Sequence, residues 1–389
     1  MTFRIGSSSV AQGQTPSSRK GARSAARMKI AQLAPLAESV PPSLYGGTER
    51  VVSWLTEELV ALGHDVTLFA SGDSKTSAKL IPVWPKALRL SRRYQDPYAG
   101  YAALMEAVAQ SADQFDLIHC HSDWIHLPVL KRTGVPLVTT LHGRLDLPHV
   151  REVASKFPHA GFVSISDSQR IPIPHANWLG TVHHGMPADT LRLSSESKGD
   201  LVFLGRIAPE KGPDVAARWA KTAGRPLRIA AKIPRAQNSY FKERVSPYLD
   251  DDTIRFVGEV DEGGKQDLLG NAAALLFPID WPEPFGLVMI EAMACGTPVI
   301  ARPRGSVTEI IESGVTGFLV ESDSEAVEAI SRVANLDRRR IREAFERRFT
   351  VRRMTEQYVS IYHRLVPNAH LEAGLRSGDC TQPPHLDTR

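Results

Sequence analysis

The chain has 389 residues but no long hydrophobic run and little cysteine. No apolar segment approaches the ~18 residues that a helix needs to span a bilayer, so no transmembrane helix is predicted. The three cysteines, Cys120, Cys295 and Cys380, lie far apart and match no zinc or disulfide spacing. This usage is typical of a reducing compartment, and the predicted location is therefore the cytoplasm.

Acidic residues are absent from residues 1–27, which carry five basic ones: Arg4, Arg19, Lys20, Arg23 and Arg27. Taking these five charges from the total of +4 leaves −1 for the rest of the chain, which gives no indication of nucleic-acid binding. The segment also lacks the apolar core of a secretory signal. We expect a disordered basic leader or an overcalled start, with an organellar transit peptide as the alternative. The polar tail 367–389 is also predicted to be disordered.

Short apolar runs alternate with helical patterns from Met28 onward, which predicts an α/β fold. At this length, and with 42% hydrophobic residues, the chain can bury two ordinary cores. The first alternation predicts an N-terminal Rossmann-like domain over 28–193. The pattern restarts after a polar linker at 194–199, which predicts a second Rossmann-like domain over 194–349 and a final helix over 350–366.

Three predicted strands of the first domain end in polar side chains: His121, His142 and Ser166. The carboxyl ends of parallel strands line the ligand crevice of an open α/β sheet, so these side chains are expected there. A lone histidine is more often structural than functional. The strand-end position of His142 beside Gly143 nevertheless favours a functional role.

The sequence predicts no metal site. His119 and His121 alternate on one strand, but no nearby carboxylate or cysteine completes a set of ligands. The acidic triplet at 250–252 could be read as a metal-binding Asp-x-Asp. Its position just before a predicted strand favours a turn instead.

Residues 282–301 read PEPFGLVMIEAMACGTPVIA and predict a helix that is apolar on every face and therefore buried. Gly296 ends this helix, and Glu291 is its one polar residue. A buried carboxylate needs partners for its lone pairs, yet no Lys or Arg occurs between Lys265 and Arg302. The partner of Glu291 is therefore not expected to be local.

Glu283 lies on the loop just before the same helix. Free backbone N–H groups and the helix dipole at a helix start attract negative charge and electronegative oxygens. Two carboxylates beside such donors would suit a polyhydroxylated ligand that bears phosphate. The alternative is a structural helix in which Glu291 bonds a distant arginine or backbone amides.

Two further loops combine glycine with features that suit phosphate. Arg206 and Lys211 flank a strand–helix loop, where two fixed cations can hold a diphosphate, although cations that cap loops are common. Gly46 and Gly47 open the first helix and let the backbone approach a ligand closely, with an ordinary turn as the alternative. Because this is not G-x-G-x-x-G, a nicotinamide fingerprint is absent.

The stretch EPFGLVMIEAMACGTPVIA resembles the donor-binding E-x7-E signature of retaining family-4 glycosyltransferases, also called glycosyltransferase group 1. Glu283 and Glu291 hold its two acidic positions, and the resemblance covers roughly Met28 to Leu365. It implies the GT-B fold, in which two facing Rossmann-like domains enclose a donor cleft. It also implies that the final helix, 350–366, crosses back onto the N-terminal domain.

The resemblance implies donor-binding roles in the second domain. Glu283 would lie beside the transferred sugar and Glu291 would hold the ribose hydroxyls of the nucleotide. Arg206 and Lys211 match the family's diphosphate clamp. The backbone amides around three residues would face the sugar: Phe285, Gly286 and Leu287.

Further matches are less specific. The glycine loop with Gly46 and Gly47 would meet the donor diphosphate from the first domain, and His142 would help to place the sugar. Lys265 matches a position on the side of the nucleotide base, with an exposed lysine at a helix start as the alternative. The block 305–310 also matches the family pattern and is expected to pack against the cleft wall.

These matches imply a retaining, metal-independent hexosyltransferase without a cofactor, with Glu283, Arg206, Lys211 and His142 as its catalytic residues. The donor would be a nucleotide diphosphate sugar, with UDP-sugars favoured and GDP-sugars as the second choice. First-domain loops at 84–101 and 144–157 would read the acceptor hydroxyl compound. The alternatives are a nucleotide-sugar epimerase and a non-catalytic module that binds nucleotide sugar.

Two basic runs stand out from this pattern. Nine arginines occur within 332–353, and a smaller cluster occupies 88–93. A solvated helical face is the favoured interpretation. Peripheral contact with anionic lipid, or with an anionic acceptor, is the alternative.

Overall fold

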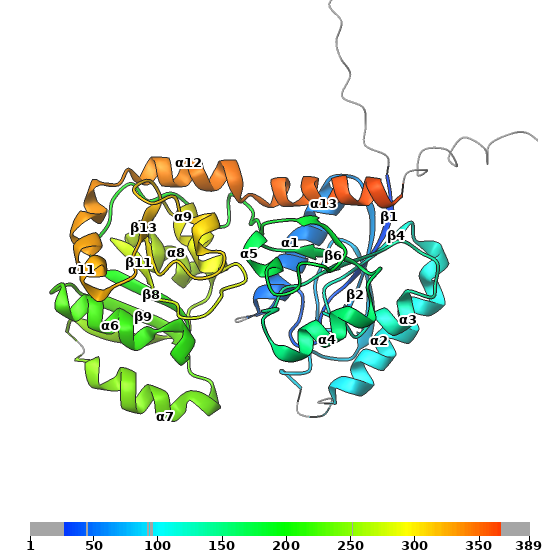
Figure 1. The fold of residues 1–389 in the computed structure, drawn as a ribbon, viewed down its shortest axis with the longest axis horizontal. Helices are drawn as coiled ribbons and strands as arrows, with labels where there is room; N and C mark the ends of the chain where they lie inside the picture. Colours follow the sequence, from blue (N-terminus) through cyan, green and yellow to red (C-terminus); the bar gives the residue numbers. More distant parts are fainter. Residues whose placement is uncertain (1–26, 44–45, 92, 94–95, 251, 367–389) are drawn as a thin grey trace, which may run out of the picture.

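The computed structural model describes residues 27–43, 46–91, 93, 96–250 and 252–366. The predicted leader, apart from Arg27, and the predicted tail at 367–389 lie outside the described residues. Figure 1 shows two lobes side by side, joined along one edge by a long helical segment. No helix within the described ranges is long and apolar enough to span a bilayer.

The first lobe is built on a seven-stranded parallel sheet in the order β3-β2-β1-β4-β5-β6-β7. Its strands are β1 (Lys29–Leu33), β2 (Asp65–Ser71), β3 (Lys79–Trp84), β4 (Leu117–Cys120), β5 (Leu137–Thr140), β6 (Gly161–Ser164) and β7 (Trp178–Thr181). Its helices are α1 (Gly47–Ala61), α2 (Pro97–Ser111), α3 (Leu127–Leu130), α4 (Pro148–Lys156) and α5 (Asp167–Arg170). Helices cover the sheet, so the central strands are buried almost throughout.

The second lobe repeats this plan with a six-stranded parallel sheet in the order β10-β9-β8-β11-β12-β13. Its strands are β8 (Leu201–Arg206), β9 (Leu227–Lys232), β10 (Ile254–Gly258), β11 (Ala274–Phe277), β12 (Val299–Ala301) and β13 (Gly317–Leu319). Its helices are α6 (Pro213–Thr222), α7 (Asn238–Tyr240), α8 (Glu262–Asn271), α9 (Leu287–Ala294), α10 (Val307–Ile310), α11 (Asp323–Arg332) and α12 (Arg338–Arg348). Numbered from its own first strand, each sheet begins 3-2-1-4-5-6, the doubly wound order that opens a ligand crevice where the order reverses.

The final helix, α13 (Val351–Leu365), returns to the first lobe, as the resemblance implied. It packs on α1 and buries Met354, Tyr358 and Tyr362 in the core beneath β1 and β4. Just before it, the backbone of Met186 pairs with Phe349 and Val351. The α/β prediction with two facing sheets and a crossover helix is therefore confirmed.

The arginine-rich run does not form a uniformly solvated face, and that interpretation is wrong for part of it. Arg338 on α12 donates to the carbonyl oxygens of Ser194 (2.6 Å) and Ala272 (2.9 Å), and Arg342 donates to that of Ala294 (2.7 Å). Carbonyls at helix ends and in loops lack partners of their own, and a guanidinium can serve several of them at once. The half-buried Arg348 does the same for Ile310, whereas the neighbouring arginines are exposed.

Candidate functional site

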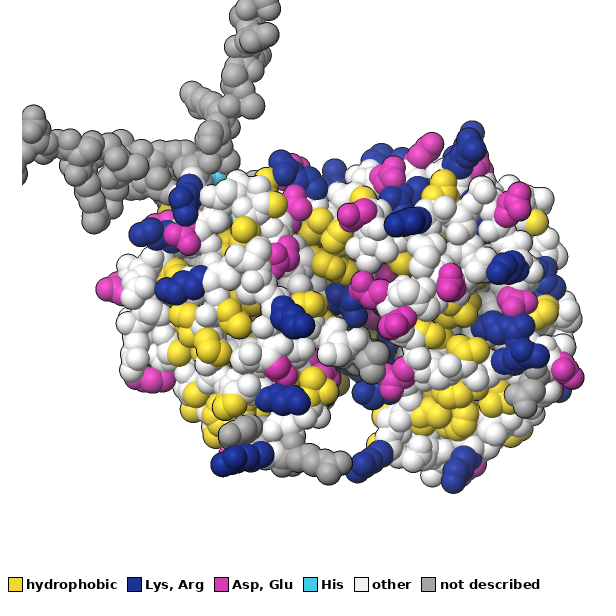
Figure 2. Space-filling model, turned by 180° about the vertical axis from the view of Figure 1, so that it is seen from behind, with side chains coloured by type: hydrophobic (Ala, Val, Ile, Leu, Met, Phe, Trp, Pro, Cys, Tyr) yellow, Lys and Arg dark blue, Asp and Glu magenta, His cyan; other side chains and the backbone are white. Residues whose placement is uncertain are grey.

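A cleft of about 1310 Å³ separates the two lobes and is lined by both. Figure 2 shows the hollow between them, with acidic and basic side chains around its rim. Every residue to which the resemblance gave a donor-binding or catalytic role lines this cleft: Gly46, Gly47, His142, Arg206, Lys211, Lys265, Glu283, Phe285, Gly286, Leu287 and Glu291. The structure therefore brings together residues that are spread over most of the chain.

Helix α9 forms the floor of the second-lobe side. Its residues Met289 to Ala294 are all buried, as its apolar sequence predicts. Gly286 precedes the helix at a φ of 81°, and a Cβ there would lie 2.7 Å from Cε of Met289. Only glycine fits this position, so the loop can turn sharply and present the helix start to the cleft.

Each of the two motif carboxylates is paired with a lysine. Lys211 Nζ lies 2.5 Å from Glu283 Oε2, and Lys265 Nζ lies 2.5 Å from Glu291 Oε1. Glu283 is 8% exposed and Glu291 is 6% exposed. Carboxylates so deeply buried need a charged partner, and these lysines supply it.

The partner of Glu291 is thus Lys265, the last basic residue before the stretch 266–301, which has none. Lys265 comes from α8, and its side chain is only 18% exposed, so the alternative of an exposed lysine at a helix start is wrong. Helix α8 begins with an Asp261 side chain that accepts a hydrogen bond from Gly264 N–H. The first turn of α8 therefore aims Lys265 at α9.

The predicted cation loop lies at the end of β8. Arg206 donates to Glu210 Oε1 at 2.7 Å, while its buried Nε has no hydrogen-bond partner among the described residues. Gly212, at a φ of 68°, lets the loop pack against Pro278, because a Cβ there would lie 2.6 Å from the Pro278 carbonyl oxygen. This packing places Lys211 Nζ 4.7 Å from the ring centre of Trp281, which also donates to Glu283.

The opposite wall carries the start of α1. A Cβ on Gly47 would lie 3.6 Å from Cδ1 of Leu287, so the first turns of α1 and α9 approach each other across the cleft. A Cβ on Gly46 would come within 2.7 Å of Pro42, which excludes larger residues. Two helix starts with free N–H groups favour an anion between them.

His142 belongs to a chain of hydrogen bonds that begins inside the first lobe. His121 Nε2 lies 2.8 Å from the Gln32 amide oxygen, and His121 Nδ1 lies 2.9 Å from His142 Nε2. Because that amide oxygen can only accept, His121 donates from Nε2 and accepts at Nδ1, so His142 donates from Nε2. Nδ1 of His142 is left as an acceptor, and it is buried and without a partner in the described chain.

Burial keeps this histidine neutral. It lowers the pKa of His142 from 6.5 to about 3, and it lowers the pKa of His121 well below its usual value. At neutral pH His142 therefore has no proton on Nδ1 to give and acts there only as an acceptor.

The crossover helix reaches the same layer, a feature that sequence reasoning missed. His119 Nδ1 lies 2.7 Å from the hydroxyl of Tyr362, and Thr140 Oγ1 lies 3.0 Å from that of Tyr358. The rings of His119 and His121 are 4.1 Å apart. The available signal was the spacing of the two tyrosines, four residues apart and so on one helical face.

Acidic and histidine side chains do not gather as a metal ion would require: the described residues contain no group of three or more potential ligands. Asp250 instead accepts from the N–H groups of Asp252, Thr253 and Ile254, which is the turn that the sequence favoured. These bonds hold the pKa of Asp250 below its usual range.

The predicted acceptor stretches also reach the cleft, although the end of the first one is helical. Arg89 lines it from a turn and Tyr98 and Tyr101 from the start of α2, while Arg144 and Phe157 line it from the second stretch. Arg144 forms a two-point ion pair with Asp146, at 2.7 and 2.6 Å, which lowers the pKa of that carboxyl. The Arg144 guanidinium also lies 5.3 Å from the ring centre of Trp281 in the other lobe.

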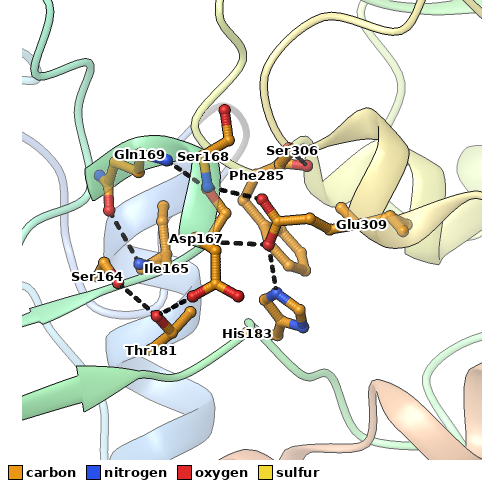
Figure 3. Close-up of polar contacts among 12 residues, drawn as sticks. Ser164, Ile165, Asp167, Ser168, Gln169, Thr181, His183, Phe285, Ser306 and Glu309 are labelled. Atoms are coloured by element: carbon orange, nitrogen blue, oxygen red, sulfur yellow. Dashed lines mark hydrogen bonds and ion pairs between the residues drawn. The ribbon is translucent and has the colours of Figure 1, made fainter. Parts of the chain in front are cut away.

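The block 305–310 packs behind the cleft wall, as expected, because Gly305 lies against the backbone of Glu283 and turns α10 behind the loop. The expectation that Ser166 lines the cleft is wrong, because Ser166 is fully buried and is not among the described residues that line it. Both lie where the lobes touch, and Figure 3 shows Glu309 of α10 facing the start of α5 and His183.

Comparisons with known proteins agree with this geometry. The family described as glycosyl transferases group 1 matches residues 192–348, and Glycosyltransferase Family 4 matches residues 45–170. A D-inositol 3-phosphate glycosyltransferase of Frankia alni is 28% identical over 335 residues, which are 71% of this chain and 82% of that protein.

Solved structures share the whole architecture. AviGT4, a glycosyltransferase involved in avilamycin A biosynthesis, superimposes with a TM-score of 0.67 at 26% identity, covering 87% of this chain and 98% of its own. HepE of Anabaena, solved in complex with UDP-glucose, gives a TM-score of 0.68 at 18% identity and covers 87% of this chain and all of its own.

Proposed function

The chain belongs to the glycosyltransferases of group 1 and family 4 and has their GT-B fold, and on this premise we propose that it transfers a hexose from a nucleotide diphosphate sugar to an acceptor hydroxyl. The proposed reaction retains the anomeric configuration and needs no metal ion. The observation that carries the proposal is the pairing of two buried carboxylates, one just before α9 and one within it, with two lysines inside the cleft.

The proposed donor lies along α9. Glu291 accepts hydrogen bonds from the ribose hydroxyls, while Lys265, already beside it, lies toward the base. The diphosphate lies between Arg206 and Lys211 and within reach of the first turn of α1 at Gly46 and Gly47. A diphosphate would satisfy the buried Nε of Arg206 that otherwise has no partner in the described chain.

The proposed chemistry uses charge rather than a covalent intermediate. The bond between the anomeric carbon and the diphosphate oxygen breaks while the acceptor oxygen bonds to the same face of that carbon. The departing diphosphate takes the acceptor's proton, and Arg206 and Lys211 stabilise its growing charge. Because the cleft excludes water when closed, transfer competes well with hydrolysis of the donor.

The sugar is proposed to lie between the motif loop and His142. Glu283 would orient the sugar through its hydroxyls rather than attack it. His142 is kept neutral by burial, so it accepts a hydrogen bond at Nδ1 and does not serve as a general acid. The N–H groups of Phe285, Gly286 and Leu287 would donate to the sugar from the other side.

UDP-sugars are the proposed first choice of donor and GDP-sugars the second. The related fold of HepE was solved with UDP-glucose, which makes that compound the first probe. The acceptor is proposed to bind on the first-lobe segments that bring Arg89, Tyr98 and Arg144 to the cleft.

Proton NMR of a mixture of the protein, UDP-glucose and a panel of hydroxyl acceptors tests this proposal. We expect UDP to be released and the new product to carry glucose in the α configuration of the donor. Release should fall by at least ~100-fold in Arg206→Ala, which removes a cation from the leaving group, and not in the exposed control Arg235→Ala. Conversion of the sugar while it stays on the nucleotide would indicate an epimerase, and tight binding without turnover would indicate a non-catalytic module.

A further inference from the structure

The loop that would hold the donor sugar precedes α9, and the carbonyl groups of residues 283–285 accept hydrogen bonds on its side away from the cleft. Ser166 Oγ donates to the Pro284 carbonyl at 2.7 Å, and Ser306 Oγ donates to the Phe285 carbonyl at 2.8 Å. Ser306 N–H also donates to the Glu283 carbonyl at 2.9 Å. Both serines are fully buried, and neither is among the residues that line the cleft in the described chain.

These bonds set the direction of the N–H groups. In a planar trans peptide the C=O and the following N–H point in opposite directions. The N–H of Phe285 therefore points away from Ser166, and the N–H of Gly286 points away from Ser306. Because Phe285 and Gly286 line the cleft while the serines lie behind the loop, both N–H groups face the cleft. No described residue accepts from either of them.

Ser166 belongs to the first lobe. It lies in a short segment that also hydrogen-bonds the backbone around His142. Its Oγ accepts from the N–H of Gln169 at 3.1 Å. The Gln169 amide then donates to the carbonyls of Leu141 (2.9 Å) and Gly143 (2.7 Å), on either side of His142. One hydrogen-bonded segment, residues 166–169, thus links the backbone around His142 to the loop that carries the cleft-facing amides.

Glu309 of the second lobe fixes this segment in place, as Figure 3 shows. Its two carboxylate oxygens accept from the N–H groups of Asp167 and Ser168, both at 2.8 Å, and from His183 Nε2 at 3.0 Å. The bond from His183 and those from the two amides hold the pKa of Glu309 below its usual value despite burial. At this contact between the lobes, an ionised carboxylate therefore accepts hydrogen bonds from three donors.

We propose that Ser166 is a positioning residue for sugar transfer: across the lobe contact it orients the Phe285 N–H toward the donor sugar and sets its distance from His142. The inference rests on the proposed function, since it assigns the sugar to that loop. Ser166 touches neither substrate nor the nucleotide-binding groups Glu291 and Arg206. Its loss should therefore weaken the recognition of the sugar and leave that of the nucleotide intact.

Isothermal titration with UDP and with UDP-glucose, together with the rate of UDP release, separates these effects. In Ser166→Ala we expect UDP affinity within twofold of the wild type, and kcat for UDP release lower by about tenfold, less than the ~100-fold that direct loss of an oriented donor costs. Any additional affinity of UDP-glucose over UDP should also fall. Ser168→Ala is the matched control, because its contact with Glu309 uses the backbone N–H, which alanine retains.

Ser306→Ala provides a second variant, should the loss of the Ser166 cap on α5 unfold the segment. Ser306 caps no N–H group through its side chain and acts on the loop from within the second lobe. We expect the same pattern, with nucleotide binding kept and kcat reduced. Equal kcat in Ser166→Ala and Ser168→Ala, or equal losses of UDP and UDP-glucose affinity, would overturn the inference. A wild-type protein that binds UDP-glucose no better than it binds glucose alone would overturn the proposed function itself.

Discussion

At the scale of single residues, the two motif carboxylates of the site form ion pairs with lysines. Glu283 and Glu291 are held beside Lys211 and Lys265, so neither of these two buried carboxylates is left without a cation. The proposed diphosphate and ribose would then bind by shifting existing contacts rather than by uncovering isolated charges. The same pairs that would serve binding also support folding, because each partner would be costly to leave alone.

Lys265→Met should therefore reduce stability as well as binding. It leaves Glu291 buried without its cation, which costs about 3 kcal/mol of the free energy of unfolding. The double variant Lys265→Met, Glu291→Met should recover most of that loss while nucleotide binding stays absent. Denaturant unfolding of both variants measures this, with the exposed Lys156→Met as the control.

A single variant as stable as the wild type would contradict the pairing. So would a double variant that is no more stable than Lys265→Met alone.

Buried histidines make stability depend on pH. Burial lowers the pKa of His119 and of His121 well below 6.5, and that of His126 to about 4. As the pH falls from about 6.5 toward 4, the unfolded chain takes up protons that the folded chain refuses, so the free energy of unfolding decreases. Each such histidine contributes up to about 1.4 kcal/mol per pH unit in that window.

His119→Gln should flatten this dependence by one histidine's share. Urea unfolding at several pH values between 7 and 4 measures the slope, and the exposed His149→Gln is expected to keep the wild-type slope. A slope in His119→Gln as steep as that of the wild type would show that His119 is not buried in its neutral form.

At the scale of elements, α12 is held in place by arginines that the sequence pattern predicted to be exposed to solvent. Arg338 and Arg342 are one turn apart, on the side of the helix that also carries the buried Ile341 and Phe345. Their guanidinium groups bond to carbonyls at the end of α9 and on neighbouring loops. Helix α12 thereby holds the C-terminal end of α9 while the N-terminal end faces the cleft.

Arg338→Ala should be much more damaging than Arg339→Ala. The first substitution leaves several carbonyl groups with no partner, which costs about 2–3 kcal/mol of unfolding free energy. The second removes an exposed side chain and should change that energy by less than about 0.5 kcal/mol. Thermal and urea unfolding of both variants measure this difference. Similar losses of unfolding free energy in Arg338→Ala and Arg339→Ala would contradict the assigned contacts.

At the scale of the whole molecule, contacts on several sides bring the two lobes together. Arg50 of α1 pairs with Glu262 of α8, Arg144 lies over Trp281, and Glu309 bonds the start of α5. Helix α13 adds a covalent connection that returns to the first lobe. The cleft is therefore shaped by both lobes at once, and the donor would meet groups from each.

The alternation of strands and helices was enough to predict two α/β domains, because most strands are short apolar runs with their own boundaries, and the resemblance added that the two sheets face each other. The motif at 282–301 also identified Glu283 and Glu291, since one polar residue in an apolar helix stands out. Lys265 was found only by resemblance, as its partnership with Glu291 depends on how α8 packs against α9. Ser166 and Glu309 could not be assigned, because their roles exist only where the lobes meet.

The most direct test of the account is a thermal-shift titration of the purified protein with uridine, guanosine and adenosine diphosphates and their sugars. We expect one nucleotide, uridine diphosphate first, to raise the unfolding temperature, and we expect Glu291→Gln and Arg206→Ala to lose that shift while Arg235→Ala keeps it. If none of these compounds shifts the unfolding temperature at millimolar concentration, the cleft is not a nucleotide-sugar site and the proposed function is wrong.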